Sequence, residues 1–133
     1  MDFQKQSVPL KKYYRKSVIK IIKMNISYRS NKIRKKLSSA AEIKKAYGTM
    51  AKKVQQRLDD IEASPNLKVL MQIPAANCHP LSGDMQGEWA LDISGNHRLV
   101  FDINHEPVPQ KETGGVDTLE VTDIRIIDTT DYH

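Results

Sequence analysis

The sequence predicts an α+β fold with the order β-α-α-β-β-β, in which two N-terminal helices pack on a mostly antiparallel sheet. Two patterns lead to this prediction. Apolar residues recur at steps of three and four between residues 39 and 64, as in an amphipathic helix. Apolar and polar residues alternate over residues 24–28 and in three segments after residue 88, as in half-buried strands. A chain of 133 residues supplies one hydrophobic core, so we expect one domain.

The first predicted strand has an apolar residue at every second position of residues 24–28. A short basic helix is expected next, over residues 31–37, because Ile33 and Leu37 then share one helical face.

The strongest helical pattern begins at a capping box, Ser39-Ala40-Ala41-Glu42, and ends at Ser64-Pro65. We expect one continuous helix between them, weakened slightly by Gly48. Its apolar stripe is interpreted as core and consists of Ile43, Ala46, Tyr47, Met50, Ala51, Val54, Leu58 and Ile61. The opposite face is basic and carries Lys44, Lys45, Lys52, Lys53 and Arg57.

The second half of the chain predicts three strands. Residues 89–93 and 97–103 alternate between apolar and polar on either side of a Gly95-Asn96 turn. A loop over residues 105–117 leads to a last strand, Leu119 to Ile127. Its apolar phase slips between residues 121 and 124, which predicts a bulge or a sheet edge there.

Positive charge is concentrated in the first half of the chain. Residues 1–63 carry 17 basic and 5 acidic side chains, whereas residues 64–133 carry 4 and 11. This asymmetry favours nucleic-acid contact through the basic face over a face that is merely solvated.

Residues 1–23 hold seven Lys or Arg and one Asp, and they allow two interpretations. They are either a basic arm for RNA or DNA or an appended, mis-started segment. We favour the second, because Met24 opens the first strand. The domain is therefore expected over residues 24–133.

Several classes of protein are excluded by composition. Cys78 is a single cysteine, so no internal disulfide forms and the cytoplasm is expected. One Cys and four dispersed His give no zinc-ligand spacing, so no metal or other cofactor is expected. Lys20 interrupts the longest apolar stretch, residues 18–22, so no membrane span is expected.

Two segments carry groups suited to proton transfer near neutral pH. The chain closes on Asp131-Tyr132-His133, and His79 lies beside a proline-stiffened turn. Cleavage of RNA without a metal needs a base for the ribose 2′-OH, a cation for the phosphoryl oxygens and an acid for the 5′-oxygen. His79 and His133 suit the base and acid, and Arg98 suits the phosphate.

The remaining roles follow from the same chemistry. Asp131 suits the orientation of an imidazole, and Tyr132 suits stacking on a base or donation of its O–H. We expect His79, Arg98 and the tail on a concave sheet face opposite the helices. Arg98 has the alternative of pairing with Asp92 across the hairpin, and His97 and His105 are interpreted as surface residues.

These motifs resemble the RelE/ParE toxin superfamily and, within it, the HigB branch of host-inhibition-of-growth or plasmid-maintenance killer proteins. The resemblance covers about residues 24–133 and is carried by residues 78–84, 87–93, 95–101 and 131–133. It implies a β-α-α-β-β-β fold and ribosome-dependent cleavage of mRNA in the A site. It implies catalytic roles for His79, Asp131, Tyr132 and His133, and a phosphate contact for Arg98.

The resemblance also implies partners: a HigA-like helix-turn-helix antitoxin, the small ribosomal subunit with its mRNA, and operator DNA through the antitoxin. The sequence departs from the family at Ser82, where many relatives have Lys, and at His97, where an aromatic residue is usual. Two other functions remain open. One is a ParE-like gyrase-inhibiting toxin, and the other is a catalytically inactive homologue that acts only as a partner of the antitoxin and its operator.

Overall fold

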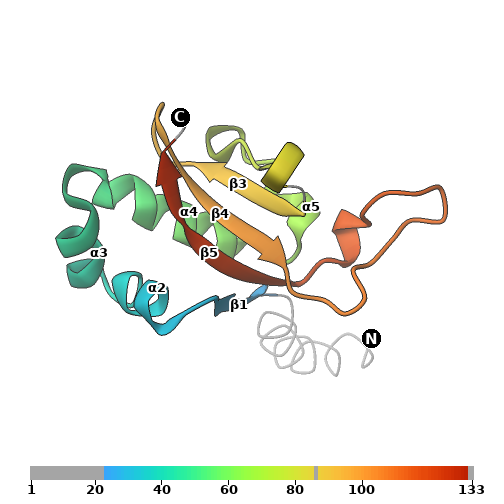
Figure 1. Ribbon diagram of the computed structural model, residues 1–133, viewed down its shortest axis with the longest axis horizontal. Coiled ribbons are helices and arrows are strands. Elements are labelled where there is room, and N and C mark those ends of the chain that lie inside the picture. Colours follow the sequence, from blue (N-terminus) through green and yellow to red (C-terminus); the bar gives the residue numbers. More distant parts are fainter. Residues whose placement is uncertain (1–22, 86, 132–133) are drawn as a thin grey trace, which may run out of the picture.

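A five-stranded sheet forms the centre of the protein (Figure 1). The computed structural model describes residues 23–85 and 87–131, and the predicted N-terminal extension lies almost wholly outside them. The strand order is β1-β5-β4-β3-β2. The strands are β1 (Asn25–Tyr28), β2 (His79–Pro80), β3 (Glu88–Asp92), β4 (His97–Ile103) and β5 (Asp123–Asp131).

Antiparallel pairing dominates the sheet, as the sequence predicts. β2, β3, β4 and β5 pair antiparallel in turn, and only β1 runs parallel to its neighbour β5. The short strand β2 was not predicted, because its two residues, His79 and Pro80, are too few to show alternation. This strand matters for the site because it fixes His79 against β3.

The predicted continuous helix over residues 40–63 is wrong at Gly48. The chain forms α3 (Ala40–Tyr47), a 3-10 turn η1 (Gly48–Met50) and α4 (Ala51–Ala63). Gly48 has φ 57° and ψ −121°, a conformation that glycine adopts readily and that ends an α-helix. The N-terminal cap is as expected, since the Ser39 side chain accepts a hydrogen bond from the Glu42 N–H at 3.1 Å.

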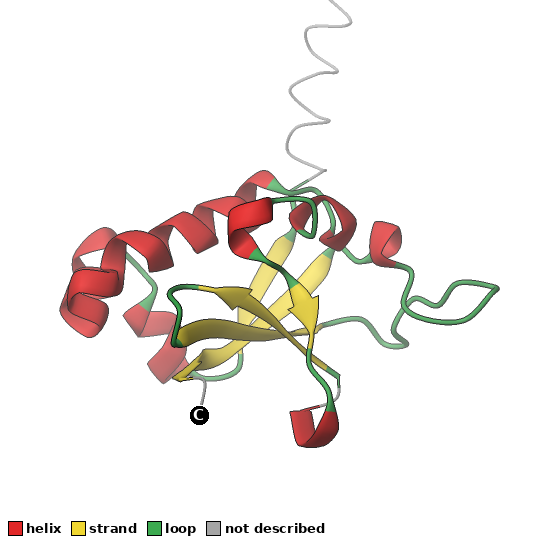
Figure 2. Cartoon of the chain, turned by 90° about the horizontal axis from the view of Figure 1, so that it is seen from above, coloured by secondary structure: helices red, strands yellow, loops and turns green. Residues whose placement is uncertain are grey.

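Two further helices, α2 (Asn31–Lys36) and α5 (Leu67–Leu70), flank this pair. α2 is the predicted short basic helix. In the orientation of Figure 2 the long helix α4 lies on one side of the strands. The turn η3 (Gly83–Met85) lies on the other side, so the sheet has one helix-covered face and one outer face.

The core lies between the helices and the sheet. Val54 and Ile61 of α4 are fully buried with Leu91, Leu99 and Phe101 of the strands. These positions confirm the alternation expected for β3 and β4 and most of the helical stripe. Ala46 is an exception, because it is exposed at the end of α3.

The last strand differs from its predicted form at both ends. Residues 118–120 form a 3-10 turn, η4 (Thr118–Glu120), so β5 begins only at Asp123. Another 3-10 turn, η2 (Pro74–Ala76), lies before β2. The bulge is at Ile127, where the pairing of β4 with β5 shifts by one residue, and not between residues 121 and 124. β5 then continues to Asp131.

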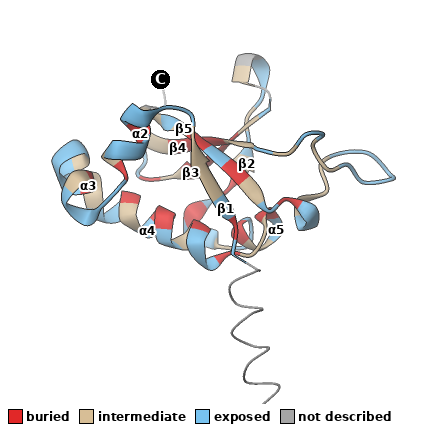
Figure 3. Ribbon diagram, turned by 90° about the horizontal axis from the view of Figure 1, so that it is seen from below, coloured by how far each residue is buried: buried red, intermediate tan, exposed pale blue. Residues whose placement is uncertain are grey.

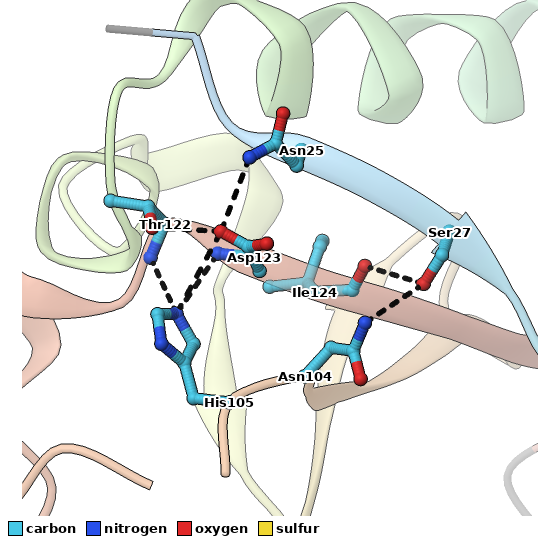
Figure 4. A network of polar contacts seen from close by, with 7 residues as sticks. All are labelled: Asn25, Ser27, Asn104, His105, Thr122, Asp123 and Ile124. Atoms are coloured by element: carbon cyan, nitrogen blue, oxygen red, sulfur yellow. Dashed lines mark hydrogen bonds and ion pairs between the residues drawn. The ribbon is translucent and has the colours of Figure 1, made fainter. Parts of the chain in front are cut away.

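The loop between β4 and β5 projects from the body of the protein (Figure 1). His105, predicted to be a surface residue, anchors its base. Its Nε2 accepts the backbone N–H groups of Thr122 at 3.0 Å and Asp123 at 3.1 Å (Figure 4). His105 is therefore structural. Among the helices of the described residues, none is long and apolar enough to cross a membrane.

Candidate catalytic face of the sheet

The outer face of the sheet carries the candidate site. Because side chains alternate between the two faces of a strand, the neighbours of buried Leu91 and Leu99 point away from the helices. Residues paired across strands share a face, and one row runs through His79, Ala90, Val100 and Asp128. The next row on this face runs through Asp92, Arg98 and Thr130.

The structure thus places His79 and Arg98 on the same face, opposite the helices, as predicted. They are separated by β3 and lie in adjacent rows. Arg98 stands directly opposite Asp92 in the register, which is the cross-strand arrangement considered as its alternative. Arg98 Nη2 also approaches Met85 Sδ at 3.5 Å, so the turn η3 folds over this part of the face.

His79 is held in one orientation. Its Nδ1 lies 2.6 Å from the backbone oxygen of Asn77. A carbonyl oxygen only accepts hydrogen bonds, so Nδ1 carries the proton in this contact. In the neutral ring the lone pair is then on Nε2, which is the atom available for proton transfer.

Cys78 anchors the same segment from the other side. Its side chain belongs to the core cluster, whereas Asn77 and His79 on either side are more exposed. Burial raises the pKa of the Cys78 thiol to about 12, so this thiol stays protonated near neutral pH. It is a packing residue and not a nucleophile.

The C-terminal residues lie only partly within the described structure. Asp131 is the last residue of β5 and pairs with His97 in the ladder. Tyr132 and His133 lie outside the described residues. Asp128, Thr129 and Thr130 were expected to form a link after the last strand, but they belong to β5 and pair with β4. The longer strand runs past Thr130, the partner of Arg98, to Asp131, which pairs with His97 at the start of β4.

Four of the five residues predicted for the basic face lie at the surface. Lys44, Lys45, Lys52 and Lys53 are exposed. Arg57 is wrongly assigned to this face, because only 3% of it is exposed. Its guanidinium donates to the backbone oxygens of Asp92 at 2.6 Å and Ala75 at 3.0 Å, and it pairs with Asp60 at 2.7 Å.

Helical spacing contains the signal for this burial. Arg57 follows Val54 by three residues and precedes Ile61 by four, so it falls on the apolar stripe. Its fork of donors satisfies three acceptors from different segments, which makes a buried arginine possible.

The structure adds α2 to the basic surface. Lys32, Lys35 and Lys36 of α2 and Lys45 of α3 line a surface pocket of about 300 Å³ together with Glu42 and Ala46. Figure 3 shows that α2 and α3 are largely exposed. The sequence predicts that α2 is basic, but its position beside α3 depends on the fold.

Residues 23–85 and 87–131 contain no group of three His, Cys, Asp or Glu side chains arranged to hold a metal ion. The polar groups on the outer face include the imidazole of His79, the guanidinium of Arg98 and the carboxylates of Asp92 and Asp128. Proton transfer and phosphate binding are the reactions that such groups support directly.

Comparison with known proteins gives similarities to solved structures only. No protein-family model and no curated protein matches this chain. A YoeB/ParE toxin from Agrobacterium tumefaciens has 17% identity and a TM-score of 0.43, with 83% of this chain and 100% of that chain covered.

Two structures from Staphylococcus aureus are also similar. The YoeB dimer has 18% identity and a TM-score of 0.45, covering 84% of this chain and 98% of that chain. The YoeB-YefM complex has 18% identity and a TM-score of 0.44, covering 83% and 97%.

Proposed function

We propose that the protein is the toxin of a type II toxin-antitoxin system and acts as a metal-independent, ribosome-dependent mRNA endoribonuclease. The observation that carries this proposal is the orientation of His79. Its Nδ1 is engaged by Asn77 at 2.6 Å, and its ring lies on the same sheet face as Arg98. This is an arrangement for proton transfer beside a phosphate.

In the proposed reaction the ribose 2′-oxygen loses its proton to a base and attacks the adjacent phosphorus. The bond from phosphorus to the 5′-oxygen breaks, and an acid protonates that oxygen. The products are a 2′,3′-cyclic phosphate and a 5′-hydroxyl. His79 and His133 divide the roles of base and acid, and Arg98 stabilises the charge on the phosphoryl oxygens.

The last residues complete the proposed site. Asp131 orients an imidazole, and Tyr132 stacks on a base or donates its O–H. β5 supports this role, since its ladder with β4 extends through the row of Arg98 and on to Asp131. Asp131 pairs with His97, next to Arg98 in the same strand.

The proposed partners follow from the family resemblance and from charge. They are the small ribosomal subunit with mRNA in its A site, a HigA-like helix-turn-helix antitoxin, and operator DNA through that antitoxin. Lys44, Lys45, Lys52 and Lys53 are exposed and suit contacts with ribosomal RNA phosphates. A cytoplasmic location is part of the same proposal.

Primer extension on cellular mRNA after brief induction tests the proposed activity. We expect cuts within translated codons for the wild-type protein and none for His79→Ala. His97→Gln is the matched control: it also removes an imidazole, but one that contacts Ser94 at the hairpin turn. We expect it to retain cleavage.

The two other functions give different outcomes in the same experiment. DNA damage without RNA cuts would identify a gyrase-inhibiting toxin. Neither RNA cuts nor DNA damage, with antitoxin binding intact, would identify an inactive homologue. Equal cleavage by wild type and His79→Ala would remove His79 from the mechanism.

A further inference from the structure

We propose that Arg57 and Asn77 are positioning residues that hold His79 as the Nδ1-protonated tautomer and so present Nε2 to the substrate. The catalytic use of Nε2 rests on the proposed function. The clamp itself rests on a chain of contacts from α4, through the segment after η2, to the ring of His79.

The first link in the chain is the buried guanidinium of Arg57. Nη2 donates to the backbone oxygen of Ala75 at 3.0 Å, and Nε donates to the backbone oxygen of Asp92 at 2.6 Å. Ala75 lies in the turn η2, and Asp92 is the last residue of β3. Arg57 therefore joins two segments that lie 17 residues apart and fixes the chain just before Asn77.

Nη1 of Arg57 pairs with Asp60 at 2.7 Å, and the two side chains are 4% and 12% exposed. Asp60 thereby neutralises a charge that burial would otherwise penalise strongly. Two further donors of the guanidinium, Nη2 and Nε, bind the segment before His79 and the strand β3. β3 carries Ala90, the strand partner of His79.

Asn77 is the second link. It has φ 45° and ψ 50°, the left-handed conformation that Asn tolerates better than most residues. Its side-chain Nδ2 donates to Asp92 Oδ2 at 3.0 Å. Arg57 and Asn77 thus bind the same residue, one through its backbone oxygen and the other through its carboxylate. The left-handed turn is held from both ends.

The consequence falls on the ring of His79. The turn at Asn77 directs its backbone oxygen to Nδ1 at 2.6 Å. In the opposite tautomer two lone pairs would face each other at this distance, which is repulsive. Cys78, buried between the two residues, fixes the segment to the core. The clamp therefore selects the tautomer through the backbone of Asn77.

Two substitutions at Asn77 separate the parts of the clamp. Asn77→Gly and Asn77→Val both remove the bond to Asp92. Gly accepts the left-handed conformation, whereas β-branched Val strongly disfavours it. The full-length protein is studied by long-range ¹H–¹⁵N NMR of its His rings, which reports the tautomer directly. Single-turnover cleavage on programmed ribosomes gives the rate at saturation and the half-saturating ribosome concentration.

For the wild type we expect His79 with its proton on Nδ1. Asn77→Val is expected to populate both tautomers and to lower the saturated rate at least about tenfold, with little change in half-saturation. Asn77→Gly, which removes the bond to Asp92 but accepts the left-handed turn, is expected to lose less of the tautomer and of the rate than Asn77→Val. Arg57→Lys is expected to resemble Asn77→Val, because a point charge cannot satisfy carbonyls of two segments. Ile61→Val, fully buried in the same helix, controls for lost stability.

Three results would overturn the proposal. The first is a wild-type His79 with its proton on Nε2, and the second is an unchanged tautomer in both Asn77→Val and Arg57→Lys. The third is an altered tautomer with a wild-type rate, which would remove the positioning role. If the wild-type protein cleaves no RNA, but its Nδ1-protonated tautomer is lost in Asn77→Val, the clamp is supported and the proposed function is refuted.

Discussion

Arg98 is the residue whose chemistry is most specific for phosphate. A guanidinium holds two phosphoryl oxygens at once, and the ammonium of Lys does not reproduce this geometry. We expect Arg98→Lys to lower the single-turnover cleavage rate at least about tenfold, or about 1.4 kcal/mol of barrier. Arg125→Lys is the matched control, since Arg125 of β5 forms a two-bond pair with Asp102 of β4, away from the row of Arg98. Equal rates for both variants would show that Arg98 is structural.

Cys78 gives a prediction about the pH dependence of stability. Its pKa rises from 9.0 to about 12 on folding because the thiol is buried, so the folded state keeps the proton to higher pH. The associated stability is fully present below pH 9 and is lost as the pH rises toward about 12. Between about pH 9 and pH 10 the wild type should lose about 1 kcal/mol more than Cys78→Ala. Urea unfolding of both proteins measures this difference. Equal losses of unfolding free energy in the two proteins would show that the thiol of folded Cys78 is accessible and ionises normally.

At the scale of elements, Gly48 distinguishes a broken helix from a continuous one. Its φ of 57° and ψ of −121° are strained for any residue with a Cβ, although no atom would obstruct that Cβ within 4 Å. We expect Gly48→Ala to destabilise the protein by about 1–3 kcal/mol. In a continuous helix the same change would stabilise by about 0.5–1 kcal/mol. Gly95→Ala, at a glycine without positive φ, is the control, and thermal unfolding decides the sign.

The exposed lysines of α3 and α4 are predicted to act together on the ribosome. Several phosphate contacts contribute jointly to affinity, and each is weakened by salt. Changing Lys44, Lys52 and Lys53 to Glu should abolish co-sedimentation with ribosomes while leaving the melting temperature nearly unchanged, because exposed charges contribute little to folding. Lys68→Glu with Lys111→Glu reverses two exposed charges outside this face and should retain binding. If the triple variant co-sediments with ribosomes as the wild type does, these lysines are solvent-exposed residues that do not contact the ribosome.

The elements differ in how well the sequence predicts them, and the reasons are local. β3 and β4 alternate apolar with other residues in the sequence, and Leu91, Leu99 and Phe101 of this pattern belong to the core, so the pattern is visible without a structure. β2 has two residues and forms only because β3 accepts it. The helix break depends on the backbone of Gly48, which composition does not reveal. The spacing of Arg57 from Val54 and Ile61 signals its burial, but its acceptors in Ala75 and Asp92 lie far away in sequence.

Across the whole molecule, the fold brings the candidate groups together through non-local pairings. His79 reaches the outer face through β2, and Arg98 reaches it through β4. Both residues are recognisable in the sequence by their chemistry, and the alternation of β4 predicts the side on which Arg98 lies. The tautomer of His79 required the structure, because it depends on a left-handed turn at Asn77. The individual residues are therefore easier to predict from the sequence than their arrangement in the site.

Truncations near the C-terminus test the whole-molecule arrangement. Residues 128–131 are assigned to folding, and the next residues are assigned to catalysis. Residues 128–131 pair with β4, whereas Tyr132 and His133 follow the last residue of β5. A protein truncated after Asp131 should fold, bind its antitoxin and lose mRNA cleavage, because only proposed catalytic side chains are removed. Truncation after Ile127 removes paired residues of β5 and should unfold the domain.

Thermal unfolding, antitoxin co-purification and primer extension separate these outcomes. The single change His133→Ala should remove most of the cleavage that the truncation after Asp131 removes, because residues that act as one unit are not additive. A tag appended after His133 should also impair cleavage, since it crowds the imidazole. If the protein ending at Asp131 arrests growth and cuts mRNA at the wild-type rate, the base and acid must both lie within residues 1–131, and the proposed pairing of His79 with His133 fails.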